Sequence, residues 1–557
     1  MNEVRVGVFV CHCGTNIGGF LDVPGLAKYA LSLPNVVFAK DNQYTCSDAG
    51  LTEIRNAIAE NKLNRAVVAS CTPRTHEPLF RSICKEAGLN PYLFQFVNIR
   101  DQCSWVHMQE RERATEKAKA LIKMGVARAV LLEPLEEIEV EVNPRALVIG
   151  GGIAGMTCAL SLANRGFEVK LIEKEDRLGG TLNNLYMLYP THEEASKLVQ
   201  AKTKEIEKNP KIEVLTSSEV EDVKGFIGNY DVTVRQGEKE RFFKIGVIIV
   251  ATGAGTLKPV GMYGYDGENV ITQMELERML EEGRLNADTV VMIQCVGSRN
   301  EKRAYCSKVC CPTALKNAML IREANPDAQV FILYKDMVTQ GTSYEDYYGK
   351  ARETGTTFIK YSPEKHPVVE NGSVRVYDEF LGEELSLPYD LVVLSTPMVA
   401  HPDSADLAQK LKVPVDKYGF FLEAHVKLRP IDFATDGIYM CGCAHWPTNV
   451  GESISQAYGA ASRASIPLSV GHVKTEPSIA VVDEDECSGC SLCELTCPFK
   501  AIRIEETEKG RKAKVIAASC KGCGACGAGC PQKAITMRHF TDEQLLAQVI
   551  TLAEAVP

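Results

Sequence analysis

The chain has 557 residues, a formal net charge of −10 at pH 7, and 45% hydrophobic with 24% charged side chains. This is an ordinary composition for a globular protein of several domains, and the negative balance argues against a nucleic-acid-binding surface. No apolar run reaches the length of a membrane helix and no signal peptide precedes the first predicted strand, so we expect a cytoplasmic protein whose 21 cysteines stay reduced.

The N-terminal region, residues 1–143, is predicted to form a small α/β domain. Strands are expected over residues 4–10, 65–69 and 92–98, and helices over residues 52–60 and 111–124. Five cysteines fall at strand ends or in loops, where an open α/β sheet places its ligands: Cys11, Cys13, Cys46, Cys71 and Cys103. Their spacing alone is too wide to identify a metal. We expect a [4Fe–4S] cluster held by Cys46, Cys71, Cys103 and either Cys11 or Cys13.

A nucleotide-binding motif begins at residue 145. A predicted strand over residues 145–149 is followed by Gly150, Gly152 and Gly155 in the pattern G-x-G-x-x-G. A predicted helix over residues 154–165 comes next, and then a strand over residues 168–172 that leads to Glu173. The glycines let the backbone approach a pyrophosphate at the helix N-terminus, and the acidic residue binds ribose hydroxyls. The motif therefore predicts an adenine dinucleotide.

Further segments favour FAD over NAD. The stretch from Glu173 to Gly180 resembles the E-x3-R-x-G-G continuation of flavoproteins of the thioredoxin reductase type, and residues 251–253 resemble the turn that closes such a domain. Cys443 stands where the final FAD motif places an aspartate, so we expect the ribityl contact to pass to the backbone or to the helix that begins near Gly451. The FAD domain is predicted over residues 144–260 and 385–475. Its expected FAD-binding residues are Gly150, Gly152, Ile153, Ala154, Gly155, Glu173, Lys174, Arg177, Gly179, Gly180, Ala251, Thr252, Gly253, Gly442 and Cys443.

The middle domain, residues 261–384, occupies the place where a two-dinucleotide flavoprotein binds NAD(P)H. Its predicted strands over residues 289–294 and 328–334 have no G-x-G-x-x-G between them, and a nicotinamide dinucleotide needs that close backbone approach. The loop instead holds four cysteines in the pattern C-x10-C-x3-C-C: Cys295, Cys306, Cys310 and Cys311. We interpret them as ligands of a [4Fe–4S] cluster beside the flavin, which would receive electrons through clusters and not as hydride. The alternative is a set of buried apolar cysteines.

Two copies of the pattern C-x2-C-x2-C-x3-C-P occupy the predicted ferredoxin domain, residues 476–540. In this two-cluster signature the fourth cysteine of each run binds the other cube, because three closely spaced thiolates wrap one corner and the fourth must come from across the fold. The two [4Fe–4S] clusters are thus assigned to Cys487, Cys490, Cys493 and Cys530, and to Cys520, Cys523, Cys526 and Cys497. A zinc site would leave the third cysteine of each run without a role.

Residues 541–557 are predicted to form a C-terminal helix. It starts with a capping box, in which Thr541 stands three residues before Gln544. Its apolar side chains share one face: Leu545, Leu546, Val549, Ile550, Leu552 and Ala553. This face either packs on the chain's own ferredoxin domain or joins two copies of the chain.

Together these segments predict an α/β protein with a thioredoxin-reductase-like FAD domain, an N-terminal α/β domain, a degenerate second dinucleotide-type domain and a C-terminal two-[4Fe–4S] ferredoxin domain. The combination resembles the A-type subunit of heterodisulfide reductase over essentially the whole chain. The resemblance is carried by the segments around Cys11, Cys46, Cys71 and Cys103, together with the FAD motif, the middle-domain cysteines and the ferredoxin pair. It implies an oxidoreductase subunit that splits electron pairs between a donor, ferredoxin and a higher-potential acceptor.

The resemblance also implies partners and one catalytic residue. The implied partners are B- and C-type heterodisulfide reductase subunits, a hydrogenase- or formate-dehydrogenase-linked iron–sulfur subunit or acyl-CoA-reducing subunits, with ferredoxin, and a second copy of the chain as a homodimer. Lys316 stands about one turn into a helix that follows Cys310 and Pro312. The resemblance implies that it faces N5 of the flavin, where a cation stabilises the reduced anion. The alternative is a solvated helix lysine.

The chain departs from the family pattern in one respect. Many members carry an additional ferredoxin-like insertion within the flavin domain, whereas residues 181–243 contain no cysteine. That insertion would supply a low-potential exit for electrons, so two other functions stay open. One is an NAD(P)H-linked FAD oxidoreductase with a fused ferredoxin, which prompt flavin bleaching by NADH would favour. The other is a non-catalytic electron-wire and assembly subunit, which would reduce neither ferredoxin nor a dye.

Overall fold

The computed structural model describes residues 3–370 and 372–555. The chain divides into two compact units, one made of Met1–Glu139 with Lys474–Pro557 and the other of Val140–Val473. Strands β5 (Ile138–Glu141) and β24 (His472–Thr475) carry the chain between the units. None of the helices in the described ranges is long and apolar enough to cross a membrane.

A parallel sheet in the order β2-β1-β3-β4 forms the centre of the N-terminal domain. All residues of β1 are buried, because helices cover both faces of a parallel sheet. Since the strands run in one direction, Cys11 at the end of β1 and Cys71 just after β3 arrive at the same edge. The elements are β1 (Val6–Cys11), α1 (Thr15–Gly18), α2 (Val23–Leu31), β2 (Val36–Asn42), α3 (Asp48–Glu60), β3 (Arg65–Ser70), α4 (Pro73–Glu86), β4 (Phe94–Asn98) and α5 (Arg111–Val130).

Helix α5 continues past the expected end at residue 124 to Val130. The sequence places Gly125 there, and glycine is a poor helix former. In the structure Gly125 is buried, and a Cβ added to it would lie 2.3 Å from a Val97 side-chain carbon. The glycine thus lets the helix approach β4 closely, and this packing overrides the local propensity.

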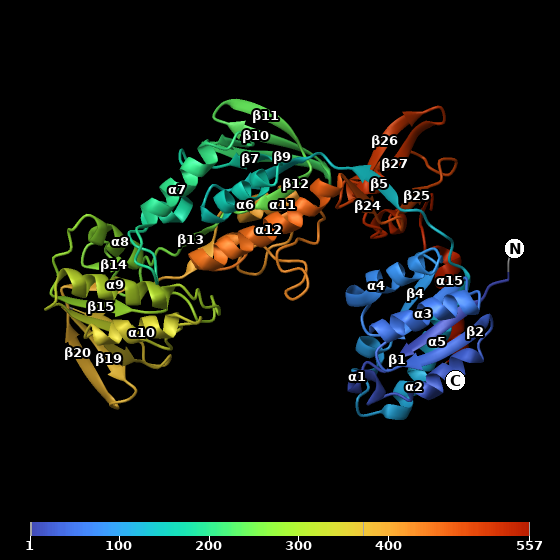
Figure 1. Cartoon of the computed structure of the whole chain (residues 1–557), viewed down its shortest axis with the longest axis horizontal. Helices are drawn as coiled ribbons and strands as arrows, with labels where there is room; N and C mark the ends of the chain where they lie inside the picture. Colours follow the sequence, from blue (N-terminus) through green and yellow to red (C-terminus); the bar gives the residue numbers. More distant parts are fainter. Residues whose placement is uncertain (1–2, 371, 556–557) are drawn as a thin grey trace. The chain divides into compact units, whose positions relative to one another are not determined.

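The flavin-type domain is built on a parallel sheet in the order β23-β12-β6-β7-β8. Helices α6 (Ile153–Asn164) and α12 (Val450–Val470) lie side by side on this sheet (Figure 1). An antiparallel sheet of β9, β10 and β11 packs on the opposite face. The remaining bounds are β6 (Arg145–Ile149), β7 (Glu168–Ile172), α7 (Ala195–Glu207), β8 (Ile212–Leu215), β9 (Ser218–Phe226), β10 (Asn229–Gln236), β11 (Lys239–Ile245), β12 (Val247–Val250), α11 (Ser404–Leu411) and β23 (Ile438–Met440).

The middle domain has its own parallel sheet, in the order β14-β21-β15-β16-β17, with α9 and α10 beside it (Figure 1). A pair of short strands, β13 (Ala254–Thr256) and β22 (Met398–Ala400), joins it to the flavin-type domain. Its elements are β14 (Val270–Thr272), α8 (Gln273–Glu281), β15 (Thr289–Ile293), α9 (Cys310–Ala324), β16 (Gln329–Tyr334), α10 (Tyr344–Glu353), β17 (Thr357–Lys360), β18 (Val368–Glu370), β19 (Ser373–Asp378), β20 (Glu383–Pro388) and β21 (Leu391–Leu394).

The ferredoxin segment consists of two antiparallel strand pairs and two short helices. Strand β25 (Ala480–Val482) pairs with β28 (Ile535–Met537), and β26 (Ile502–Thr507) pairs with β27 (Gly510–Val515). The helices are α13 (Leu492–Thr496) and α14 (Ala525–Ala528). They are short because the cysteine runs leave little chain between ligands.

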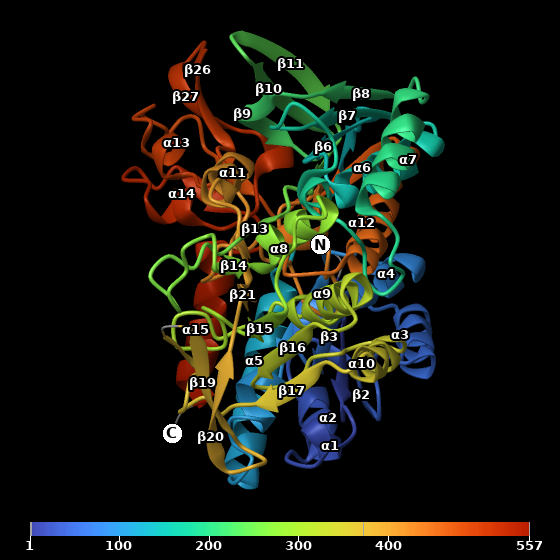
Figure 2. The same ribbon diagram turned by 90° about the vertical axis from the view of Figure 1, so that its left-hand side faces the viewer.

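The C-terminal helix α15 (Asp542–Ala555) packs beside α5 of the N-terminal domain (Figures 1 and 2). The Thr541 N–H donates to the Gln544 side-chain oxygen and the Gln544 N–H donates to the Thr541 hydroxyl, which confirms the predicted capping box. The buried side chains of α15 are polar: Thr551, and Gln544, whose Nε2 donates to the Leu131 carbonyl at 2.9 Å. The predicted apolar face is turned outward, with Leu545, Leu546, Val549, Ile550 and Leu552 between 41% and 60% exposed.

Candidate functional site

A cavity of about 930 Å³ lies in the Val140–Val473 unit, at the carboxyl ends of β6, β7 and β12. Open α/β sheets bind their ligands at these ends, and the volume suits a dinucleotide. All the predicted FAD-binding residues except Gly155 and Gly442 line the cavity. The start of α9 and residues 187–189 also contribute to its wall.

The glycine loop between β6 and α6 has no room for side chains where it meets its neighbours. A Cβ at Gly155 would lie 1.8 Å from the Gly150 carbonyl oxygen, and one at Gly150, whose φ is +108°, would lie 2.3 Å from that of Ala251. Gly152 borders the cavity, and a Cβ there would meet nothing nearer than 4.0 Å. No side chain of the described residues caps α6, so its first N–H groups are available to a pyrophosphate.

Glu173 follows β7 at the cavity wall. Its carboxylate accepts hydrogen bonds from the backbone N–H of Gly151 at 2.6 Å and of Glu175 at 2.8 Å, which fixes its position beside the glycine loop. Lys174 instead pairs with Asp403 at 2.6 Å and Glu219 at 3.0 Å, and hydrogen bonds to these two carboxylates raise its pKa. Glu173 is therefore placed to bind a ribose, whereas Lys174 is already engaged with carboxylates.

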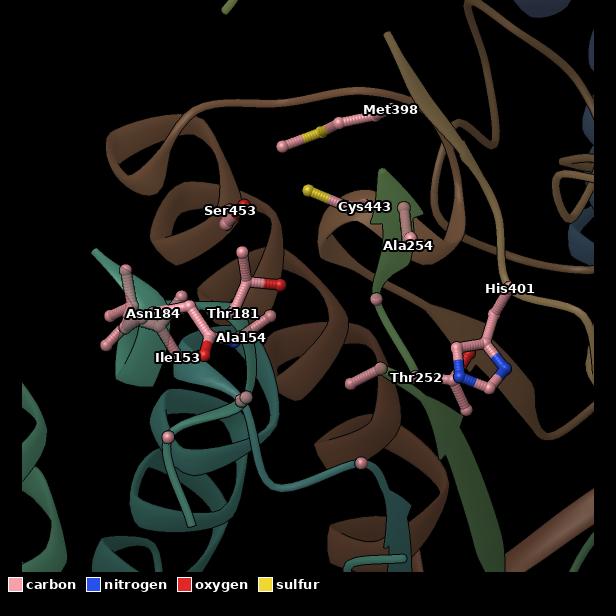
Figure 3. Close-up of a pocket in the computed structure, with 18 of the residues that line it drawn as sticks. Ile153, Ala154, Thr181, Asn184, Thr252, Ala254, Met398, His401, Cys443 and Ser453 are labelled. Carbon is pink, nitrogen blue, oxygen red and sulfur yellow. The ribbon is translucent and has the colours of Figure 1, made fainter. Parts of the chain in front are cut away.

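Cys443, which replaces the aspartate of the final FAD motif, points into the cavity near Met398 (Figure 3). Its sulfur lies 3.3 Å from the Thr448 hydroxyl, which contacts the Ser453 hydroxyl at 2.9 Å. The Thr252 hydroxyl, also in the cavity wall, is buried and has no hydrogen-bond partner among the described residues. These uncharged groups fit the hydroxyl-bearing ribityl chain of a flavin.

Lys316 lines the same cavity from α9 and is 1% exposed, so the alternative of a solvated helix lysine is wrong. Its Nζ forms an ion pair with Glu277 of α8 and donates to the Met187 carbonyl at 2.8 Å. Burial lowers the pKa of Lys316, and the charge and hydrogen bond of Glu277 oppose that shift.

The four middle-domain cysteines come together beside this cavity, which Cys310 lines. Burial raises the pKa of Cys310, and the neighbouring thiolates of Cys311, Cys295 and Cys306 raise it further. Cys295 directs the loop away from β15 with a left-handed backbone, at a φ of +62°. The predicted ligand set is thus one local group next to the predicted flavin site.

Two polar side chains near Cys295, one buried and one half-buried, have buried hydrogen-bonding atoms without a partner among the described residues. Gln294 is 0% exposed, and neither atom of its amide has a partner among the described residues. Arg299 hydrogen-bonds Cys295 and pairs with Asp336 at 2.5 Å, while its buried Nη1 lacks a partner in the same part of the chain. Buried groups are normally satisfied, and cluster sulfurs accept hydrogen bonds, so these residues fit a cubane.

In the N-terminal domain four of the five predicted cysteines form one group. Burial raises the pKa of Cys46, and the thiolates of Cys11, Cys71 and Cys13 add to the shift. The Thr45 N–H donates to the Cys11 sulfur at 3.4 Å. Arg100 approaches the group from η1 (Arg100–Ser104), with its Nη1 3.9 Å from the Cys13 sulfur.

Cys103 lies apart from this group, which differs from the expectation that it is a ligand. It is 0% exposed, and its thiol donates to the Ala114 carbonyl of α5 at 3.0 Å. Burial raises its pKa to about 11, and Lys117 opposes the shift. Cys103 does follow the end of β4, as the strand-end pattern requires, but its side chain turns toward the core, where α5 covers it. Cys11 and Cys13 both join Cys46 and Cys71 instead.

In the ferredoxin segment the structure shows the crossed arrangement for the second predicted ligand set. Burial raises the pKa of Cys526, and the neighbouring thiolates of Cys520, Cys497 and Cys523 raise it further. Cys497 of the first run therefore lies with the second run, as the signature requires. No group of three or more His, Cys, Asp or Glu side chains in the described ranges is placed to hold a single metal ion. A cube is wider than one ion, since each thiolate binds a different iron.

Sequence reasoning missed several residues that surround these sites: Arg100, Glu277, Gln294 and Arg299. Gln294 and Arg299 stand beside Cys295 in sequence, so their position in the loop was an available signal. Glu277 gave no signal, because it precedes Lys316 by 39 residues and meets it only through the packing of α8 on α9.

Two family models match the chain. A pyridine nucleotide-disulphide oxidoreductase model matches residues 144–296, and a 4Fe-4S dicluster domain model matches residues 480–537. With the dinucleotide cavity and the cysteine groups, these matches define an oxidoreductase that uses a flavin and iron–sulfur clusters for electron transfer.

The chain is 40% identical, over 647 aligned positions, to the A subunit of the H(2):CoB-CoM heterodisulfide,ferredoxin reductase of Methanothermobacter thermautotrophicus, covering 99% of this chain and 97% of that protein. It is also 40% identical to the first of the iron-sulfur A subunits of the CoB–CoM heterodisulfide reductase of Methanopyrus kandleri, covering 100% and 98%. Thioredoxin reductase from Lactococcus lactis aligns with a TM-score of 0.43 and 17% identity, over 59% of this chain and 100% of that one. The chain belongs to the family of heterodisulfide reductase A subunits.

Proposed function

We propose that the chain is the flavin-bearing electron-transfer subunit of a heterodisulfide-reductase-like complex, with one FAD and about four [4Fe–4S] clusters by counting cysteine groups. The position of the middle-domain cysteines is the observation that supports this most. Cys295, Cys306, Cys310 and Cys311 occupy the loop where a two-dinucleotide flavoprotein binds its nicotinamide, and Cys310 lines the cavity. FAD supplies the exchange between one-electron and two-electron chemistry. The chain's own residues hold it, with Gly150–Gly155 at the pyrophosphate.

The finer proposal is that this site divides an electron pair between ferredoxin and a higher-potential acceptor, or joins two single electrons in the reverse direction. The Methanothermobacter relative is named for both a heterodisulfide and ferredoxin. Its alignment is longer than the 557 residues of this chain, so this chain lacks segments that the relative contains. Residues 181–243 hold no cysteine and fold into α7 and β8–β11 with their connections. We therefore propose the C-terminal ferredoxin domain as the low-potential exit.

In a complex purified anaerobically with its partners, ferredoxin reduction should require the high-potential acceptor. The downhill transfer of one electron drives the uphill transfer of the other, so the two acceptors should gain electrons in equal numbers. Absorbance of both, recorded with and without the acceptor, measures the coupling. Undiminished ferredoxin reduction without the acceptor would argue against bifurcation, and no reduction of ferredoxin or a dye would favour the electron-wire function.

The partners are proposed from the relatives and not from a surface of this chain. They are B- and C-like subunits, a hydrogenase- or formate-dehydrogenase-linked iron–sulfur subunit or acyl-CoA-reducing subunits, and ferredoxin, all in the cytoplasm. Identifying the subunits that co-purify under gentle conditions would select among them.

We also propose that α15 mediates a homodimer. Its outward face offers Leu546 at 56% and Val549 at 60% exposure. Leu546→Glu should weaken the dimer, because an unpaired charge buried in an apolar contact costs about 3 kcal/mol, on the order of 100-fold in the dissociation constant. Leu381→Glu, at a position 64% exposed in the turn between β19 and β20, is the matched control and should leave the dimer intact. Sedimentation of the native complex measures the state, and a monodisperse monomer at micromolar concentration would contradict the proposal.

Lys316 is proposed to face N5 of the bound flavin. Its place in the cavity wall near Cys310 supports this role, because both belong to the first two turns of α9. A cation there stabilises the reduced anion and raises the flavin potential.

A further inference from the structure

An ion pair that is removed from solvent stands behind the flavin cavity. The side chains of Lys316 and Glu277 are 1% and 0% exposed. Lys316 lines the cavity, whereas Glu277 lies in α8 and is not among the lining residues. Burying two charges is costly, and well-packed apolar residues would stabilise the fold equally well. The pair therefore needs an explanation other than packing.

The geometry around the pair holds the lysine in one place. Nζ donates to the Met187 carbonyl at 2.8 Å as well as contacting Glu277. The second oxygen of Glu277 accepts from the Tyr186 N–H at 3.1 Å. Met187 itself lines the cavity, so the pair fixes the ammonium between that part of the wall and α8. Lys316 cannot turn away without breaking both of its own interactions.

Few other charges reach the pair. His192, in the segment before α7, lies close enough to Lys316 for their charges to interact, and Tyr347 of α10 lies close to Glu277. The pKa of His192 is lowered, mainly by burial, and burial raises that of Tyr347. Both groups are thus neutral near neutral pH, and β16, which also contacts α9, contributes no ionisable side chain to the pair. Among the described residues, Glu277 is the counter-charge of Lys316.

We propose that Glu277 is a positioning residue that keeps Lys316 protonated and directed into the cavity. Without that carboxylate, burial would favour the uncharged amine. This matters for a flavin fed by clusters, because clusters deliver electrons without protons and the added negative charge needs a fixed cation. The inference rests on the proposed role of the cavity as the FAD site and of Lys316 beside N5.

The test is the flavin midpoint potential of the FAD-loaded full chain, measured from neutral to alkaline pH in four proteins: wild type, Glu277→Gln, Lys316→Met and the double variant. Lys316→Met should lower the potential at every pH. It should retain FAD, whose pyrophosphate contacts lie at Gly150–Gly155, and unaltered cluster spectra. Glu277→Gln should match or exceed the wild-type potential at the lowest pH, because the lysine is then charged without a counter-charge. At alkaline pH its potential should fall to that of Lys316→Met, as the amine loses its proton.

The double variant should follow Lys316→Met at all pH values, because Glu277 acts only through the lysine. Glu281→Gln, at an exposed position of α8, is the matched control and should follow wild type. Glu277→Asp retains the carboxylate, so its potential should not show the fall at alkaline pH that is expected for Glu277→Gln. This variant keeps the test available if Glu277→Gln does not load FAD. A fall of the Glu277→Asp flavin potential at alkaline pH, like that expected for Glu277→Gln, would overturn the proposal.

The outcomes separate this inference from the function on which it rests. A Glu277→Gln curve parallel to wild type, beside a lowered Lys316→Met curve, would overturn the role of Glu277 and leave Lys316 at the flavin. An unchanged potential in fully loaded Lys316→Met would overturn both, because the lysine would then not face the flavin.

Discussion

Anaerobically loaded protein should contain about sixteen iron atoms and one FAD per chain, at four irons for each of four cysteine groups. Single substitutions should remove iron in steps, because a cube that loses one thiolate is poorly held. Cys306→Ser and Cys46→Ser should each lower the count by about four. Cys84→Ser is the control and should leave the count unchanged, since Cys84 lies on the buried side of α4 and is 0% exposed.

Iron analysis and electron paramagnetic resonance of the reduced protein measure this prediction. A wild-type count of about eight iron atoms would mean that neither the N-terminal nor the middle-domain cluster exists, and a count of about twelve would mean that only one of them does. Further substitutions distinguish which of the N-terminal cysteines bind the cluster. The structure predicts that Cys103→Ala retains all iron and that Cys11→Ser and Cys13→Ser each lose one cluster, whereas iron loss in Cys103→Ala would restore Cys103 as a ligand.

NADH and NADPH should be poor reductants of the flavin. The pyrophosphate of a nicotinamide dinucleotide needs a glycine-rich turn between a strand and the helix that follows it. Here β15 is followed by Gln294 and Cys295, whose loop is filled by the four cysteines. We expect flavin bleaching by NADH to be slower by at least about 100-fold than bleaching by a one-electron donor, the loss that about 3 kcal/mol of missing binding would produce. The control is a donor of comparable potential that carries no dinucleotide, such as a reduced viologen.

Much of the site could be predicted because its chemistry depends on local spacing. The glycines at 150, 152 and 155 and the two ferredoxin runs place their groups by the geometry of a few consecutive residues. Strand-end positions located Cys11, Cys46 and Cys71 for the same reason, since parallel strands deliver their carboxyl ends to one edge.

The parts that were missed depend on contacts between distant segments. Cys103 obeys the strand-end pattern, but its side chain turns under α5 to the Ala114 carbonyl, and no local pattern encodes that choice. The helix expected over residues 111–124 continues to Val130, because Gly125 packs closely on Val97. The role of Glu277 could not be predicted, because it contacts Lys316 only through the packing of α8 on α9. The apolar residues of α15 do share one face, as their spacing predicts. That the helix packs on α5 and turns Leu546 outward depends on tertiary contacts, which the spacing does not encode.

The measurement that tests the central claim most directly is the anaerobic absorbance of the bound flavin after mixing the fully loaded chain with either reduced ferredoxin or NADH. If electrons reach the flavin through clusters, reduced ferredoxin should bleach it and NADH alone should not. In Cys306→Ser that retains FAD and the ferredoxin clusters, bleaching by ferredoxin should be lost or greatly slowed. Prompt, stoichiometric bleaching by NADH without a partner protein, unchanged in Cys306→Ser, would contradict the account.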